Sequence, residues 1–187
     1  MQYIRANERD TAIVARDWIN LENVTMLHSE RAVAAKFREV WVVNVYAPSG
    51  KAMKQERERF FNSEFHILLT GSSNYLLLGG DFNCILETSN PTGGFNYSRA
   101  LAELMHSLAL RDIWPSNPAR KDYSHYSVSG ATRIDRIYAT HDLVAMKMGV
   151  EFIVTPFTDH FAVCLRISTV LPIMRPGRGY GKWTAPS

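Results

Sequence analysis

Three short segments of this sequence place acids, an amide and a histidine where they could act together on a phosphate. Asp81 and Asn83 directly follow an apolar run and two glycines. Asp135 lies in an alternating polar and apolar run, and Asp159 and His160 precede another apolar run. Such a set can hold a divalent metal through oxygens, orient a histidine through a carboxylate, and bind a phosphate.

Each segment also has a purely structural interpretation, and these alternatives stay open at this point. Asp81 could cap a turn, as Asp and Asn often do. Asp135 could form an ion pair with Arg133 or Arg136, because a buried carboxylate without a partner is costly. The third segment could be a solvated loop. A structural interpretation of all three segments requires three coincidences in order along the chain.

Hydrophobic periodicity predicts the elements that position these residues. Strands are expected over residues 11–15, 40–46, 75–78, 132–139, 150–155 and 161–168, a hairpin over 23–37, and helices over 51–69 and 99–110. The two glycines at 79 and 80 are expected to turn the chain tightly. Extended backbone would then point Asp81 and Asn83 to the same side. Many strands with only two good helices predict an α/β (α+β) fold.

Composition places the chain among soluble globular proteins of one domain. It has 187 residues, 46% of them apolar and 21% charged, and a net charge of +3. That charge permits a polyanionic partner without arguing for one. We expect no membrane span and no signal peptide. We also expect Cys84 and Cys164 to be reduced thiols of an intracellular protein. Residues 1–170 form the expected domain, and residues 171–187 a basic tail or linker that contains Gly and Pro.

The sequence lacks the motifs of several other kinds of functional site. The six histidines and two cysteines show no zinc-binding spacing. No Walker A loop and no Gly-x-Ser-x-Gly elbow are present.

The three segments together resemble the endonuclease/exonuclease/phosphatase superfamily: residues 79–83 (GGDFN), 133–137 (RIDRI) and 158–160 (TDH). More narrowly, residues 44–50 (NVYAPSG) and the spacing are similar to endonuclease domains of non-LTR (LINE-type) retrotransposons, relatives of apurinic/apyrimidinic endonucleases. The resemblance implies a four-layer α/β sandwich of two packed mixed sheets flanked by helices. It also implies hydrolysis of DNA phosphodiesters with Mg²⁺ (or Mn²⁺) and a water nucleophile.

The resemblance implies a role for each matching residue. Asp81 would take the proton of the attacking water, and Asn83 would contact the scissile phosphate. Asp135 would orient His160, which would stabilise the negative charge that develops on the phosphate. Tyr46 would touch the phosphate.

The remaining implied residues bind the metal ion or the substrate. Asp159 is the carboxylate on the metal side, and Ser124 and Thr132 would line the substrate rim. The implied metal ligands are Asp159, Asp81, Asn83 and His160. Ser49 replaces an asparagine that is frequent in relatives, which leaves a DNA-backbone contact there in doubt.

The start of the chain departs from the family pattern. The family's first two strands normally bring an asparagine and a metal-ligating glutamate to the site, whereas the strand at residues 11–15 resembles a later strand of that pattern. The pair Gln55–Glu56 lies on the predicted helix instead. We therefore expect a domain that is truncated at its N-terminus, with exposed sheet edges, weak Mg²⁺ binding, and weak or no activity.

The expected function is a retroelement-derived, metal-dependent DNA endonuclease that nicks target DNA. It would be a monomer in the nucleus, and a downstream reverse-transcriptase domain would fit the resemblance. One alternative is a phosphatase or phosphodiesterase of the same superfamily that acts on another substrate, which residues 87–96 and 122–132 would decide. Another is a non-catalytic nucleic-acid-binding remnant that uses the basic tail and the region of Arg136.

Overall fold

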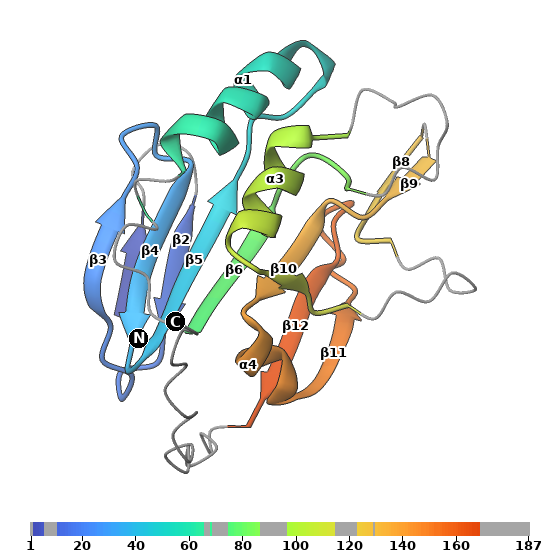
Figure 1. Cartoon of the computed structure of the whole chain (residues 1–187). Helices are drawn as coiled ribbons and strands as arrows, with labels where there is room; N and C mark the ends of the chain where they lie inside the picture. Colours follow the sequence, from blue (N-terminus) through green and yellow to red (C-terminus); the bar gives the residue numbers. More distant parts are fainter. Residues whose placement is uncertain are drawn as a thin grey trace, which may run out of the picture.

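The computed structural model describes residues 2–5, 11–65, 68, 75–86, 97–114, 123–128 and 130–168. These residues form a mixed α/β fold in which helices cover one face of a six-stranded sheet and shorter β ribbons lie on its other side (Figure 1). The fold class predicted from the sequence is confirmed. Three predicted segments lie outside the described residues, namely residues 87–96, the tail 171–187 and residues 66, 67 and 69 of the first predicted helix.

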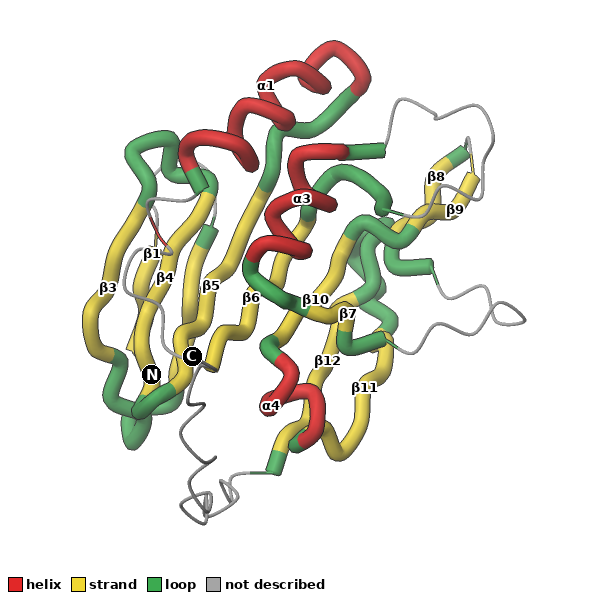
Figure 2. The backbone as a smooth tube through the Cα atoms, in the orientation of Figure 1, coloured by secondary structure: helices red, strands yellow, loops and turns green. Residues whose placement is uncertain are grey.

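The main sheet has the strand order β3-β4-β5-β6-β10-β7 (Figure 2). Its strands are β3 (Glu22–Met26), β4 (Ala32–Phe37), β5 (Val40–Tyr46), β6 (Tyr75–Asp81), β7 (Arg111–Asp112) and β10 (Asp135–Ala139). β5 and β6 run parallel, and the other neighbouring strands are antiparallel. The hairpin β3–β4 and the strand β5 lie where the sequence predicts them.

The expected single strand over residues 132–139 is wrong. The chain divides there into β9 (Gly130–Thr132), which pairs with β8 (His125–Ser127), and β10 of the main sheet. The division has a local cause, because the N–H groups of Ile134 and Asp135 both donate to the hydroxyl of Ser124.

The expected tight turn at the two glycines is also wrong, because β6 continues through them to Asp81. The glycines instead allow two strands to approach closely. A Cβ atom on Gly80, whose φ is +136°, would lie 2.0 Å from the carbonyl oxygen of Val45. Only glycine fits there, and its presence lets β6 carry Asp81 to the sheet edge in register with both neighbouring strands.

Two helical segments cover one face of the main sheet. The first runs through a 3₁₀ turn (Lys51–Met53), α1 (Lys54–Arg59) and a π-helical turn (Phe60–Glu64), and the second is α3 (Arg99–Ser107). Ser98 caps α3 by accepting the N–H of Leu101 at 3.1 Å. The core between the helices and the sheet contains Val43, Val45, Phe60, Phe61, Leu76, Leu78, Phe82, Leu101, Leu104 and Met105. The apolar residues at helical spacing in α3 therefore pack into this core.

The charged run at residues 56–59 is largely turned into the protein, and only Arg59 is exposed. Arg57 is 1% exposed, and its guanidinium donates to the carbonyl oxygens of Pro48 and Gly50 at 2.8 and 3.4 Å. Glu58 accepts the N–H of Ala100 at the start of α3 at 2.9 Å. These two side chains join α1 to the loop after β5 and to α3, so the run is structural.

The other face of the main sheet carries two antiparallel ribbons. β1 (Gln2–Arg5) pairs with β2 (Ala12–Ala15), and β11 (Lys147–Ile153) pairs with β12 (Ala162–Ile167). A groove of about 440 Å³ is lined by β2 on one side and by β12 on the other. β5, β6 and β10 also contribute to its walls, and the groove reaches Asp81 and Asp135.

The short helix α4 (His141–Ala145) joins β10 to β11, and Leu143 packs into a second, smaller core. In the described part of the chain, no helix has both the length and the apolar character needed to span a membrane. Cys84 and Cys164 are free thiols, as expected, and burial raises the pKa of Cys84 to about 12.

Candidate active site

Strand register places three of the predicted site residues in one row across the main sheet. Tyr46, the last residue of β5, is the partner of Asp81, the last residue of β6. Asp81 is in turn the partner of Asp135, the first residue of β10. Residues that are directly opposite each other in neighbouring strands point to the same face of the sheet. The two carboxylates therefore lie side by side at one edge of the sheet, with Tyr46 exposed at its rim.

Asp135 holds a histidine in a fixed orientation. The Nδ1 atom of His160 lies 2.9 Å from Oδ2 of Asp135. An ionised carboxylate can only accept hydrogen bonds, so Nδ1 is the donor and Nε2 is directed away from Asp135. The orientation of His160 by Asp135 that the resemblance implies is therefore present in the geometry.

The arginines next to Asp135 do not pair with it in the way that the structural alternative required. Nη1 of Arg133 and Nη1 of Arg136 lie 2.9 and 3.0 Å from the same oxygen of Asp112, on β7. Arg136 is buried, so this ion pair lies mostly within the protein. Because Asp112 binds these guanidinium groups, the Asp135 carboxylate is available to His160.

Asp81 has the electrostatic character of a general base near neutral pH. Burial, and then the negative charge of Asp135, raise its pKa from 3.8 to about 6. The backbone N–H of Asn83 opposes this rise by donating to Oδ1 of Asp81 at 2.8 Å. The charges of the His160 and His125 imidazoles also oppose it. A base with such a pKa is ionised at neutral pH and can still accept a proton.

Asn83 does not lie beside Asp81 on extended backbone, so that prediction is wrong. Its φ of +49° takes the chain out of the strand. Its side-chain nitrogen donates to the carbonyl oxygen of Ala47 at 2.9 Å, while the N–H of Ala47 donates to the carbonyl oxygen of Asp81. Asn83 therefore ties together the loops that follow β5 and β6. Its contact with the phosphate stays a prediction.

Ser124 positions other site residues, whereas the place of Thr132 on the substrate rim stays a prediction. Ser124 is completely buried, and its hydroxyl accepts the N–H groups of Ile134 and Asp135 at 3.1 and 2.9 Å, so its predicted place on the substrate rim is wrong. Thr132 is half-buried, and its hydroxyl lies 3.4 Å from Nδ1 of His125. Both side chains hold neighbouring site residues in place.

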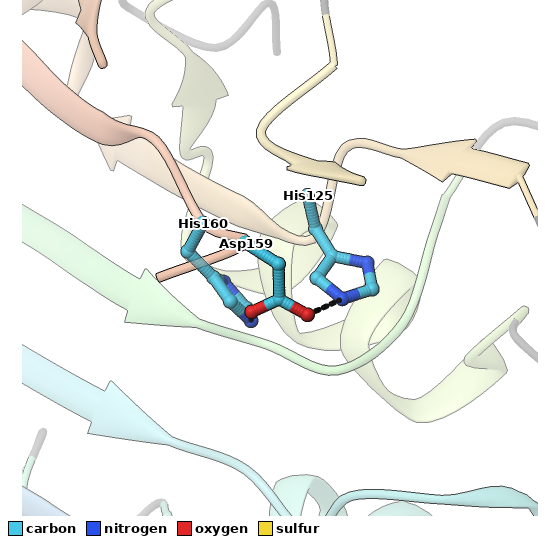
Figure 3. Close-up of side chains that lie close together, drawn as sticks. All are labelled: His125, Asp159 and His160. Carbon is cyan, nitrogen blue, oxygen red and sulfur yellow. Dashed lines mark hydrogen bonds and ion pairs between the residues drawn. The ribbon is translucent and has the colours of Figure 1, made fainter. Parts of the chain in front are cut away.

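His125 is a site residue that the sequence analysis missed. Its Nε2 atom lies 3.2 Å from Oδ2 of Asp159, and its ring centre lies 4.6 Å from that of His160 (Figure 3). No local pattern marks this histidine, because its partners follow it by 34 and 35 positions in the chain. Asp159 is exposed, and its pKa is lowered first by its own backbone N–H and then by the two imidazoles.

The described side chains can hold a divalent cation in two ways. Asp81, Asp135 and His160 form one group, and His125, Asp159 and His160 form another, each with its ligand atoms within 4.8 Å of one another. The first group contains two half-buried carboxylates that repel each other, and a cation would relieve this repulsion. The residues present therefore fit a divalent metal ion, and Asp159 and Asp81 fall in different groups.

Comparison with solved structures identifies nuclease folds. The 3'-5' exonuclease NExo of Neisseria meningitidis matches with a TM-score of 0.64 and 18% identity, over 80% of this chain and 72% of that one. An AP endonuclease of Archaeoglobus fulgidus gives 0.62 and 18%, with the same coverage. The endonuclease domain of TRAS1, a telomere-specific non-LTR retrotransposon, gives 0.59 and 17%, over 89% of this chain and 77% of that domain.

Sequence comparison gives a relative among transposon proteins. The chain is 33% identical over 136 residues to the transposon TX1 149 kDa protein of Xenopus laevis. The match covers 68% of this chain, and the chain spans 10% of the length of that relative. No protein-family model matches the sequence. The fold that the resemblance implies is confirmed, because the chain shares it with solved structures of an exonuclease, an AP endonuclease and a retrotransposon endonuclease domain.

Proposed function

We propose that this chain, which has the endonuclease/exonuclease/phosphatase fold, is a retrotransposon-derived endonuclease domain that hydrolyses phosphodiester bonds in DNA. One observation carries the proposal: Asp81, with a pKa of about 6, lies opposite the carboxylate that orients His160. A base and an oriented imidazole at one sheet edge are the parts that phosphodiester hydrolysis by water needs. The names of the TX1 and TRAS1 relatives support DNA and a mobile element.

In the proposed reaction, water attacks the phosphorus atom while Asp81 accepts its proton. The new O–P bond forms as the bond to the leaving sugar oxygen breaks, and solvent protonates that oxygen. In its protonated form, His160 donates from Nε2 to a phosphate oxygen while its Nδ1–H donates to Asp135. The row of Tyr46, Asp81 and Asp135 places these groups on one face.

We further propose that Mg²⁺, or Mn²⁺, is the cation of the reaction. Asp81 and Asp135 would hold it with His160 beside them, and Asp159 stays a proposed ligand at the rim. When bound, a divalent cation neutralises charge on the phosphate and polarises it. The chain's own contribution is to keep two carboxylates close to each other at the end of rigid strands.

The wider setting of the domain is also a proposal. We propose that the domain acts on DNA in the nucleus, as a monomer, together with a reverse transcriptase of the same element. These proposals rest on the transposon relatives. The residues expected to decide between DNA and another phosphodiester include 87–96, which lie outside the described residues.

The test is nicking of supercoiled plasmid by the purified chain with Mg²⁺, with Mn²⁺ and with EDTA. We expect slow nicking that requires the metal and is lost in Asp81→Asn and His160→Ala. Glu103→Gln is the matched control, because Glu103 is an exposed acid on α3 whose partner is Arg99. A chain that melts cooperatively but does not nick DNA at any metal concentration would contradict the proposal.

A further inference from the structure

His125, Asp159 and His160 form a cluster at the rim of the site that the reaction above does not need as a unit. Figure 3 shows the Asp159 carboxylate between the two imidazole rings. His125 comes from β8, and the other two residues precede β12. The Nε2 atoms of His125 and His160 lie 3.2 and 4.0 Å from the two oxygens of Asp159.

Backbone hydrogen bonds fix the two segments that carry the cluster. His125 and His160 are partners in an antiparallel bridge. Beside it, the N–H of Tyr126 donates to the carbonyl of Asp159 at 3.0 Å, and the N–H of Phe161 donates to the carbonyl of Ser124 at 2.7 Å. The separation of the two imidazoles is therefore set by the fold and not by mobile side chains alone.

Each imidazole is also oriented by an oxygen behind it. Nδ1 of His160 has the Asp135 carboxylate as its partner at 2.9 Å, and Nδ1 of His125 has the Thr132 hydroxyl at 3.4 Å. Both rings consequently direct Nε2 towards Asp159. A histidine that binds a metal through one nitrogen and has its other nitrogen held by a protein oxygen is the usual arrangement at metal sites.

The distances suit a small dication. The three ligand atoms lie within 4.8 Å of one another. Zn–N and Zn–O bonds of about 2.0–2.2 Å in a tetrahedron separate ligand atoms by about 3.3–3.6 Å. The Asp159 side chain is 61% exposed, so its carboxylate can turn towards both imidazoles without disturbing the core.

We propose that His125, Asp159 and His160 bind one transition-metal dication of the Zn²⁺ class, with a ligand position left open to solvent. Two imidazoles and one carboxylate favour Zn²⁺ or Co²⁺, whereas Mg²⁺ prefers oxygen ligands alone. The site is therefore distinct in its chemistry from the carboxylate pair of Asp81 and Asp135, although both include His160.

Because both sites include His160, a metal ion bound by the rim cluster affects catalysis. This effect on catalysis, unlike the metal binding itself, rests on the proposed function. A cation on Nε2 of His160 occupies the nitrogen that donates to the phosphate. Zn²⁺ at this site therefore inhibits nicking that Mg²⁺ supports. The rim cluster is an inhibitory metal site that overlaps the active site.

The binding test uses the metal alone and needs no DNA. Co²⁺ is titrated into the metal-free chain and followed by its visible absorption, and Zn²⁺ binding is measured by calorimetry and by displacement of Co²⁺. We expect one Co²⁺ per chain at this site, and at least about tenfold weaker binding in His125→Asn. His141→Asn is the matched control, because His141 is an exposed histidine paired with the adjacent Asp142 on α4.

Equal affinity in His125→Asn and the unchanged chain would overturn the site, as would no Co²⁺ binding by a chain that melts cooperatively.

In a second arm, nicking with Mg²⁺ is measured with and without micromolar Zn²⁺, and the ratio is compared within each variant. We expect strong inhibition in the unchanged chain and in His141→Asn, and little in His125→Asn. Equal inhibition in all three would overturn the inhibitory role. A chain that fails to nick at all contradicts the proposed function but leaves the Co²⁺ result readable.

Discussion

Asp81 and Asp135 are directly opposite each other on the antiparallel strands β6 and β10, and each has a different partner. Asp81 accepts the N–H of Asn83, whereas Asp135 accepts Nδ1–H of His160. Two neighbouring carboxylates with separate partners can take separate roles, one as a base and the other as an orienting group. The raised pKa of Asp81 follows from its burial and from this neighbour.

The first prediction is that Asp81→Asn stabilises the protein at neutral pH while it abolishes nicking. The folded-state pKa of about 6 exceeds the unfolded value of 3.8, so the folded state binds more protons between these values. The free energy of unfolding therefore falls as pH rises through this window, by up to about 3 kcal/mol. Asparagine keeps an oxygen for the N–H of Asn83 and carries no charge.

Urea unfolding at pH 5 and pH 8 measures this effect. The stability gained in Asp81→Asn is expected to be larger at pH 8, with Glu103→Gln unchanged at both. A loss of stability in Asp81→Asn at pH 8 would show that burial and the charge of Asp135 do not destabilise the ionised Asp81 carboxylate. The nicking rate of the unchanged chain should also fall as pH drops below about 6, because the base becomes protonated.

The second prediction concerns Ser124, which acts on the reaction through Asp135. Ser124→Ala leaves the N–H groups of Ile134 and Asp135 without their buried acceptor, at a cost of about 2–4 kcal/mol. Since the N–H of Asp135 is one of them, we expect the nicking rate to fall more than DNA binding does. Ser127→Ala, at an exposed serine of the same hairpin, is the control.

Single-turnover nicking and a DNA-binding assay separate these effects for Ser124. A stable Ser124→Ala protein with an unchanged nicking rate would show that the position of Asp135 does not depend on this hydroxyl. Ser124→Thr retains the acceptor oxygen and should recover part of the rate.

The third prediction is that Gly80→Ala strongly destabilises the fold. A Cβ atom would lie 2.0 Å from the carbonyl oxygen of Val45 and 2.8 Å from its nitrogen, so β5 and β6 would have to separate. Gly130→Ala is a matched control, because its φ of +135° is nearly the same and no atom lies within 4 Å of its Cβ position.

Chemical denaturation of both glycine variants distinguishes collision from backbone strain. We expect Gly130→Ala to lose about 1–2 kcal/mol from its φ angle alone, and Gly80→Ala to lose much more or fail to fold. Similar losses in the two variants would mean that the close approach of the strands is not what requires glycine at position 80.

The fourth prediction concerns the buried guanidinium of Arg57. Arg57→Ala removes the donor to the carbonyl oxygens of Pro48 and Gly50 and leaves a cavity under α1. We expect a loss of roughly 2–4 kcal/mol, since a buried acceptor loses a charged partner. Arg59→Ala, two positions later and exposed, should change the free energy of unfolding by less than about 0.5 kcal/mol. Thermal melts of the two variants compare these values, and equal melting temperatures would contradict the structural role of Arg57.

Much of the fold could be predicted from sequence because its elements have strong local patterns. The strands predicted over residues 40–46 and 75–78 are present as β5 and the start of β6, and the helix predicted over residues 99–110 contains α3. The order of the motifs also predicted which residues would meet, and Asp81, Asp135 and His160 do. Local spacing carries this information because side-chain direction repeats every two residues in a strand and every three to four in a helix.

Other features were decided only by contacts between residues far apart in the sequence. Asp112 binds both arginines next to Asp135, Arg57 is buried under its own helix, and His125 faces residues more than 30 positions away. The sequence by itself determined the elements and the chemical groups available at the sheet edge. The tertiary structure decided which carboxylate pairs with which cation, because that choice depends on strand register and burial, and neither is written in the pattern of any single segment.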